Sequence, residues 1–172
     1  MTKSNIEKSN LAKRATQKEI ILILDNLRSV QNVASIFRTA NTAGINKVFL
    51  IGSTPGPVDR FGRPRANFLK ISLGAEKSFS LEYKNQTIPV LEELKRAGFK
   101  IIAIEQSTNS SDYRKVGRGK RTVFIVGNEK TGLSKPVLVK CDAIAEIKMR
   151  GGKESLNVSV ALAVALFRIL DI

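Results

Sequence analysis

Asn32 and Arg38 are the first side chains along the sequence whose types could do chemistry together. Six residues separate them, so Asn32 falls near the start of a predicted helix and Arg38 about two turns further in, on a different face. An arginine beside an apolar stripe either keeps its charge in water above a packed stem or pairs with an acid. Alternatively, its planar guanidinium clamps a phosphate through two parallel hydrogen bonds. This segment alone leaves these alternatives open.

A second candidate segment, residues 127–134, follows a predicted strand and is bounded by glycines. Gly127 and Gly132 have the spacing of a phosphate-binding P-loop, but Leu133 stands where that loop needs lysine. The missing lysine excludes a P-loop NTPase. No strand is followed by Gly-x-Gly-x-x-Gly, so a dinucleotide-binding fold has no support either. The loop is then an ordinary strand-to-helix turn or a source of backbone groups for a ligand.

A third segment, residues 147–159, leads into the last predicted helix. Ser155 or Asn157 is the expected N-cap of that helix, because both side chains accept hydrogen bonds from free backbone N–H groups. A helix N-terminus is also a favourable place for a carboxylate or an oxyanion. Capping and ligand binding are therefore both compatible with this segment.

Composition narrows the chemistry. The 172 residues include no histidine, which excludes imidazole bases, Ser-His-Asp triads and metal sites that need histidine. The single Cys141 forms neither an internal disulfide nor a thiolate metal cluster, and we expect a packed thiol in a cytoplasmic protein without a metal. The 29 Lys and Arg against 15 Asp and Glu indicate a polyanionic partner, nucleic acid before anionic membrane. The longest apolar stretch, residues 158–167, is too short to span a bilayer.

Strand and helix patterns alternate from Glu19 onward. Short apolar runs predict strands buried on both faces at residues 20–24, 47–51, 100–105, 122–126 and 143–147. Helical spacing predicts helices from Val30 to a stop at Gly44, near 66–73, over 87–97 and over 156–170. The last helix is apolar almost all round and is expected to be buried. The pattern indicates one α/β domain, residues 19–172, with a mostly parallel sheet covered by helices on both faces.

The three candidate segments are specific when they are taken together. They contain, in order, Asn-Val-Ala-Ser-Ile-Phe-Arg-Thr-Ala (32–40), Phe-Ile-Val-Gly-Asn-Glu-Lys-Thr-Gly-Leu-Ser (124–134) and Glu-Ser-Leu-Asn-Val-Ser-Val-Ala (154–161). This series closely resembles the three motifs of the TrmH/SpoU family of RNA 2′-O-ribose methyltransferases, in the SPOUT superfamily. The resemblance covers nearly the whole chain, from about residue 19 to the C-terminus.

The resemblance implies a fold, a cofactor and an assembly. The family has an α/β domain whose C-terminal part forms a deep trefoil knot, works as a homodimer and holds S-adenosylmethionine in the knot. The matching catalytic residues are Asn32, Arg38, Glu129, Ser155 and Asn157. The positions expected to hold the cofactor, largely through backbone, are Ile125, Gly127, Ile147, Met149, Leu156 and Asn157.

The implied reaction is in-line attack of a ribose 2′-hydroxyl on the sulfonium methyl, which needs no metal. Family proposals make the arginine a general base, but an arginine is effectively never deprotonated in proteins. We therefore expect Arg38 to orient the ribose-phosphate and to stabilise the developing alkoxide. Asn32 would orient Arg38 or the hydroxyl, and Glu129 is expected to position the substrate or support its loop rather than act as a base.

Two positions depart from the family pattern. Lys148 replaces the proline that often precedes the third-motif methionine, and Asn41 stands where an aspartate is common. Lys148 would loosen the cofactor loop or add an RNA contact. Because all five expected catalytic residues are present, we expect an active enzyme.

Two polar loops, around residues 52–65 and 109–120, are rich in positive charge and would line the RNA path. The candidate RNA-binding residues are Arg60, Arg63, Arg65, Arg114, Lys115, Arg118 and Lys120. The alternative is that some of these charges only maintain solubility. Residues 1–18 are expected to form a flexible basic tail, either a solvated terminus or an arm that touches RNA.

The expected substrate is tRNA, with ribosomal RNA as the alternative. Some family members carry an N-terminal RNA-binding domain, whereas 18 residues precede the first predicted strand here. The catalytic domain, the tail and the dimer would then recognise the RNA. The rival function is a non-catalytic RNA-binding protein on the same fold, and the intact motifs disfavour it.

Overall fold

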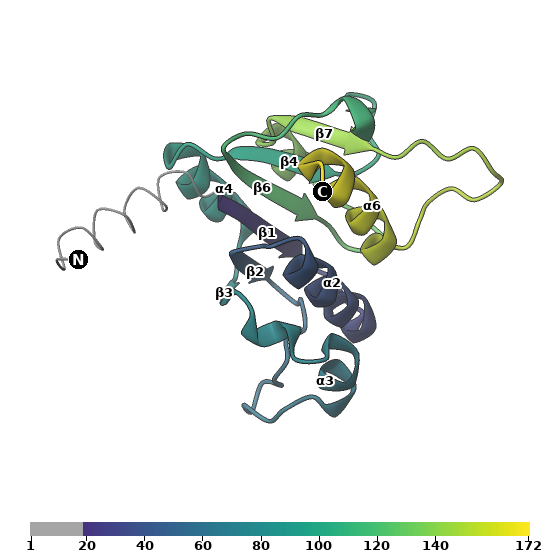
Figure 1. The fold of residues 1–172 in the computed structure, drawn as a ribbon. Coiled ribbons are helices and arrows are strands. Elements are labelled where there is room, and N and C mark those ends of the chain that lie inside the picture. The colour runs from purple at the N-terminus through teal and green to yellow at the C-terminus, as the bar shows by residue number, and fades with distance from the viewer. Residues whose placement is uncertain (1–18) are drawn as a thin grey trace, which may run out of the picture.

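A computed structural model describes residues 19–172, which form a seven-stranded sheet with helices on both faces (Figure 1). The strands are β1 (Glu19–Asp25), β2 (Lys47–Ile51), β3 (Ser80–Lys84), β4 (Lys100–Ile104), β5 (Ser111–Asp112), β6 (Arg121–Val126) and β7 (Ala143–Glu146). Their order in the sheet is β3-β2-β1-β6-β4-β7-β5, and every pair is parallel. The predicted fold class, a parallel α/β sheet, is confirmed.

Two helical layers cover the sheet. The helices are α2 (Val30–Thr42), α3 (Ala66–Ser72), α4 (Thr87–Arg96), α5 (Lys135–Val139) and α6 (Val158–Leu170). Helices α2, α3 and α6 contribute to one apolar core, and α4 and α5 to the other. Among the described helices, none combines the length and apolar character that a membrane span requires.

Strand β1 shows why the sequence forms a sheet with two cores. Its side chains alternate between the faces, so Leu22 and Leu24 enter the core beneath α2 and α6, while Ile21 and Ile23 enter the core beneath α4. From Ile20 to Asp25 every residue of the strand is buried. A continuous apolar run is what a parallel strand covered on both faces requires.

Three elements differ from the sequence-based expectation. Strand β3 was not predicted, because its Ser-Leu-Glu-Tyr-Lys segment is half-exposed at the sheet edge and has no apolar run. The segment 109–120, predicted as a loop, contains the two-residue strand β5 and a 3₁₀ turn over Tyr113–Lys115. Helix α5 was also missed, since it has only five residues.

Helix α6 is not buried on every side, which corrects the prediction. Leu162, Ala165 and Leu166 face the core, whereas the side chains of Val160 and Val164 are 46% and 40% exposed. An apolar stripe of α6 therefore faces outward in the single chain. The trefoil knot implied by the resemblance and the tail over residues 1–18, which lies outside the described residues, stay predictions.

Candidate active site

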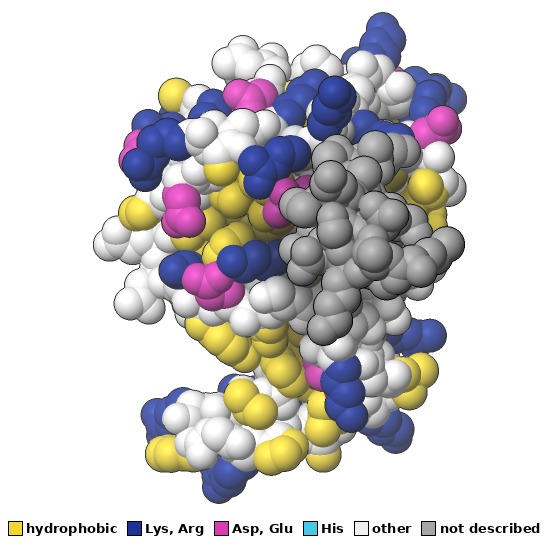
Figure 2. All heavy atoms as spheres, turned by 60° about the vertical axis from the view of Figure 1, so that its left-hand side comes forward, with side chains coloured by type: hydrophobic (Ala, Val, Ile, Leu, Met, Phe, Trp, Pro, Cys, Tyr) yellow, Lys and Arg dark blue, Asp and Glu magenta, His cyan; other side chains and the backbone are white. Residues whose placement is uncertain are grey.

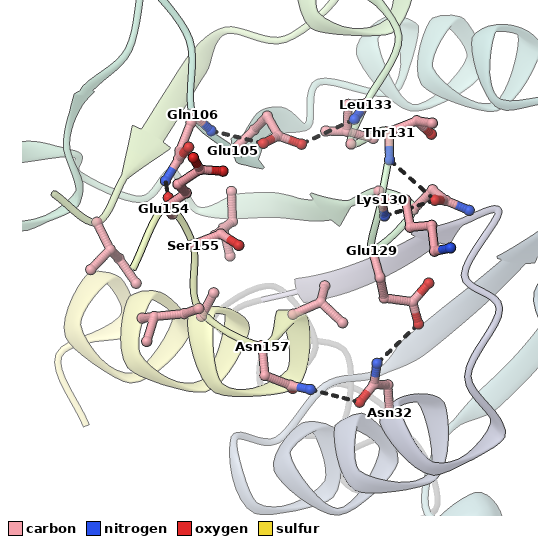
Figure 3. Close-up of a pocket in the computed structure, with 18 of the residues that line it drawn as sticks. Asn32, Glu105, Gln106, Glu129, Lys130, Thr131, Leu133, Glu154, Ser155 and Asn157 are labelled. Atoms are coloured by element: carbon pink, nitrogen blue, oxygen red, sulfur yellow. Dashed lines mark hydrogen bonds between the residues drawn. The ribbon is translucent and has the colours of Figure 1, made fainter. Parts of the chain in front are cut away.

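Three segments far apart in the sequence converge at the carboxyl ends of the strands (Figure 3). The Glu129 carboxylate accepts hydrogen bonds from the Asn32 side chain at 2.9 Å and from the backbone N–H groups of Arg28 at 2.9 Å and Ser29 at 3.1 Å. The Asn32 side-chain oxygen in turn accepts a hydrogen bond from Asn157 Nδ2 at 3.0 Å. We call Asn32, Glu129 and Asn157 the amide–carboxylate network.

Helix caps place both asparagines of this network. Ser29 caps α2 by accepting from the Asn32 N–H at 3.2 Å, which fixes Asn32 in the first turn of that helix. Asn157 caps α6, because its Oδ1 accepts from the Ser159 N–H at 2.9 Å. Its amide nitrogen stays available for Asn32. Asn157 therefore caps the helix and joins the network, which confirms the capping prediction, while ligand binding at this segment stays a prediction.

The Glu129 carboxylate is held in its ionised form. Partial burial raises its pKa, but the hydrogen bonds from Asn32, Arg28 N–H and Ser29 N–H outweigh that effect and hold the pKa below its ordinary value. An ionised carboxylate only accepts hydrogen bonds. Glu129 therefore acts as an anchor for Asn32, rather than as an acid near neutral pH.

The loop between β6 and α5 is shaped by two glycines. Gly132 has a φ of +64° and lies so near Glu105 that an added Cβ would stand 2.5 Å from its carboxylate. A Cβ on Gly127 would stand 2.6 Å from the Leu133 nitrogen. Glu105 fixes the far side of the loop by accepting from the Leu133 N–H at 3.0 Å. The loop thus presents backbone groups in one set arrangement.

A cavity of about 640 Å³ lies beside the network, within the size range of small-molecule sites. Its walls come from the ends of β4, β6 and β7 and from the segment before α6. Apolar side chains such as Ile104, Leu138 and Ala161 line it together with polar groups such as Gln106 and Thr131. Such mixed walls suit a ligand with an aromatic ring and a charged or hydroxylated part.

Most of the expected cofactor positions line this cavity. These positions are Gly127, Ile147, Met149, Leu156 and Asn157. The catalytic candidates Asn32, Glu129 and Ser155 line the same cavity. Ile125 differs, because its side chain is fully buried in the core beneath α4 and does not line the cavity.

Arg38 stands apart from the other catalytic candidates. It is exposed on α2, about 9 Å along the helix axis from Asn32, and does not line the cavity. Among the described residues its side chain has no hydrogen bond or ion pair. The structure therefore brings together four of the five catalytic candidates and leaves Arg38 exposed outside the cavity.

Cys141 is a packed thiol, as the sequence indicated. It lies half-buried against the core beneath α4, and burial raises the pKa of its thiol to about 12. A thiol with this pKa stays neutral at physiological pH and is a poor nucleophile. Within residues 19–172, no three His, Cys, Asp or Glu side chains cluster as a metal site would need.

The seven candidate RNA-binding residues lie in two surface segments. Arg60, Arg63 and Arg65 precede α3, and the others lie between β5 and β6. All are exposed except Arg65 and Arg118, which are half-buried. Two of the cations are held by acids, since Arg63 pairs with Asp59 at 2.8 Å and Arg114 pairs with Asp112.

Two residues that the sequence did not single out also shape the cavity. Gln106 donates a hydrogen bond through Nε2 to the Glu154 carbonyl at 2.8 Å and so ties the end of β4 to the segment before α6. Glu105 braces the 127–132 loop. Their place at the carboxyl end of a predicted strand was the available signal, because ligands gather at the carboxyl ends of parallel strands.

The family model described as the SpoU rRNA Methylase family matches residues 19–167. The chain belongs to this SpoU family. One relative, the tRNA (guanosine(18)-2'-O)-methyltransferase of Aquifex aeolicus, is 31% identical over 88% of this chain and 68% of its own length. A TrmH family relative from Staphylococcus saprophyticus is 32% identical over 87% of this chain, which spans 57% of that relative's length.

Solved structures of the SpoU family show the same fold. The crystal structure of the A. aeolicus TrmH/SpoU tRNA modifying enzyme has a TM-score of 0.78 and 29% identity, covering 96% of this chain and 82% of that one. An AdoMet-bound rRNA methyltransferase from Sinorhizobium meliloti has a TM-score of 0.78 and 26% identity, covering 89% and 56%. The sheet described above is thus the sheet of SpoU methyltransferases.

Proposed function

We propose that this protein is an S-adenosylmethionine-dependent RNA methyltransferase that modifies a ribose 2′-hydroxyl. The observation that carries the proposal is the amide–carboxylate network of Asn32, Glu129 and Asn157 at the wall of a 640 Å³ cavity. Membership of the SpoU family and the AdoMet-bound neighbour from S. meliloti support it.

The cavity fits the proposed cofactor in size and in chemistry. Backbone groups of the 127–133 loop face an apolar wall that includes Ile147, Met149 and Leu156. These groups suit a purine ring, a ribose and a charged amino-acid part. When bound, S-adenosylmethionine supplies a methyl group on a positively charged sulfur, so the proposed reaction needs no metal.

The protein's part in the reaction is to place the ribose and to stabilise charge. Glu129 fixes Asn32, and Asn32 links the start of α2 to the start of α6, so the ribose meets a rigid wall. Ser155 presents a hydroxyl at the same wall. Arg38, which is exposed on α2, would clamp the substrate phosphate and stabilise the developing alkoxide.

The proposed substrate is tRNA in the cytoplasm. The formal charge of +14 and the exposed cations of both basic segments support a folded RNA. The A. aeolicus relative is named for tRNA, whereas the S. meliloti protein is named for ribosomal RNA, which keeps ribosomal RNA as the alternative. Pairing of two copies through the exposed stripe of Val160 and Val164 would bury its apolar surface, which supports the proposed homodimer.

The proposal is tested by transfer of labelled methyl from S-adenosylmethionine to unmodified tRNA and, separately, to ribosomal RNA. Label in the tRNA pool is the expected result, and label in the ribosomal RNA pool alone would mean that the substrate is ribosomal RNA. No label in either pool, with no cofactor binding in calorimetry, would favour the non-catalytic RNA-binding protein. Light scattering tests the dimer, which a mass of one chain at micromolar concentration would contradict.

A further inference from the structure

The loop over residues 57–65, which precedes α3, is closed by its own hydrogen bonds. Val58 and Pro64 form an antiparallel bridge, and the Asp59 N–H donates to the Arg63 carbonyl at 2.9 Å. The Asp59 carboxylate accepts from the N–H groups of Phe61 at 2.8 Å and Arg63 at 3.0 Å. The local bonds therefore hold the tip of the loop in one conformation.

The tip of this loop presents an aromatic ring to solvent. Phe61 is 66% exposed, whereas Phe49 and Phe99, which also lie beside cations, are each 5% exposed. The guanidinium carbons of Arg60 and Arg63 lie 4.7 Å and 5.0 Å from the centre of the Phe61 ring. Among the cation–π pairs of residues 19–172, no other ring has two cations. Figure 2 shows hydrophobic and basic side chains side by side on the lower lobe, which in Figure 1 contains α3.

This combination matches the chemistry of an unpaired nucleotide. Exposed aromatic faces stack on bases that are not already stacked in a helix, and arginines beside them neutralise phosphates. A duplex offers phosphates but no free base face to such a ring. A hydrophobic protein partner would cover the tip of the loop without supplying a counter-ion to Arg60, so the charge beside the ring favours a polyanion.

We propose that Phe61 stacks on an unpaired base of the RNA substrate while Arg60 and Arg63 contact its flanking phosphates. The inference deepens the proposed function, on which its biological meaning rests, because it names the structural class of RNA: a loop or another single-stranded segment. Arg63 is also paired with Asp59, so Arg60 carries the more available charge. The loop 57–65 would then bind RNA, while the network places the ribose.

The test uses RNA hairpins that carry 2-aminopurine at each loop position in turn, with the fully paired duplex as comparison. Stacking on Phe61 would quench the fluorescence at one loop position. Phe61→Ala should remove that quenching and weaken hairpin binding by about tenfold, without changing duplex binding. Phe61→Trp should keep both. Val139→Ala, which trims an 82% exposed side chain at the end of α5, is the matched control and should bind like the wild type.

Salt dependence separates stacking from charge. RNA affinity falls as the salt concentration rises, and Arg60→Gln should make the slope of log affinity against log salt shallower by about 1. Phe61→Ala should leave that slope unchanged. Wild-type hairpin affinity in Phe61→Ala, or no hairpin binding by the wild type, would overturn the inference. A dimer that becomes a monomer in Phe61→Ala would overturn it too, since the ring would then pack on a second copy.

The inference and the proposed function fail separately. Methyl transfer to tRNA with normal hairpin binding by Phe61→Ala would refute the stacking site and leave the enzyme class standing. Hairpin binding that depends on Phe61, without methyl transfer to any RNA, would support the stacking site and refute the proposed enzyme class.

Discussion

Glu129 and Asp59 each hold a loop by accepting several hydrogen bonds, but their partners lie at very different separations in the sequence. Each carboxylate accepts two backbone N–H groups and one side chain, Asn32 for Glu129 and Arg63 for Asp59. The partners of Glu129 lie about a hundred residues away in the sequence, whereas those of Asp59 lie within four. The geometry of the site therefore depends on the whole fold, whereas the shape of the 57–65 loop is held by hydrogen bonds within the loop.

This contrast predicts separable effects. Damage to the network should lower methyl transfer together with stability, while damage to the loop should lower RNA affinity and leave the fold intact. Arg38 lies six residues after Asn32 in the sequence, but within residues 19–172 its side chain has no hydrogen bond to either region, so its replacement should affect methyl transfer alone.

Arg38→Ala should produce the largest loss, about 1,000-fold in methyl transfer, because it removes the proposed phosphate clamp and the charge beside the alkoxide. Cofactor affinity in calorimetry and the melting temperature should match the wild type, since Arg38 does not line the cavity. Arg96→Ala on the distant α4 is the control. Near-normal transfer by Arg38→Ala would remove this residue from the site.

Glu129→Gln should lower methyl transfer by about 100-fold. The NH2 group of the new amide would face the N–H groups that Glu129 now accepts from, so Asn32 would lose its anchor. The free energy of unfolding should fall by about 1 kcal/mol, a small cost because the carboxylate is partly solvated. Glu93→Gln on the exposed face of α4 should change neither quantity. Equal transfer rates in the two variants would show that the network does not position the substrate.

Asp59→Asn, measured at high salt where the charge of the released Arg63 is screened, should weaken RNA binding by a few fold, because the 57–65 loop loses its fixed shape. The melting temperature should stay within error of the wild type, since all the bonds that are lost are local. Filter binding and thermal denaturation measure the two quantities. A large drop in melting temperature would show that Asp59, like Glu129, supports the whole fold, and would contradict the comparison.

The smallest expected effect is in the pH dependence of stability. The folded-state pKa of Glu129 lies below its ordinary value of 4.5, so its contribution is complete above that value and is lost as the pH falls through the folded-state pKa. The stability difference between wild type and Glu129→Gln should therefore be constant from pH 6 to 8 and shrink in acid. A difference that grows in acid would have the wrong sign.

Much of the sheet was predictable because its central strands are apolar on both faces. The run from Ile20 to Leu24 needs no tertiary information to be recognised as a buried parallel strand. Strand β3 escaped because edge strands carry charges such as Glu82 and Lys84, which break that pattern. The outward stripe of α6 escaped because composition shows that a helix is apolar but not which side is covered.

The sequence predicted which residues form the site, but not the hydrogen bonds between them. Motif order identified Asn32, Glu129 and Asn157, and the edge rule for parallel sheets places their segments together. Spacing could not show that one amide bridges the two other side chains, because 125 residues separate Asn32 from Asn157. Phe61 was missed as well, since the exposure of a ring depends on the tertiary structure.

The central claim is that a ribose oxygen of RNA receives a methyl group. The most direct measurement is alkaline hydrolysis of tRNA labelled by this protein, followed by separation of the products. A 2′-O-methyl group removes the hydroxyl that cleaves the adjacent phosphodiester, so the label should appear in an alkali-resistant dinucleotide. Label in ordinary mononucleotides would mean that a base was methylated, and the account of the site would be wrong.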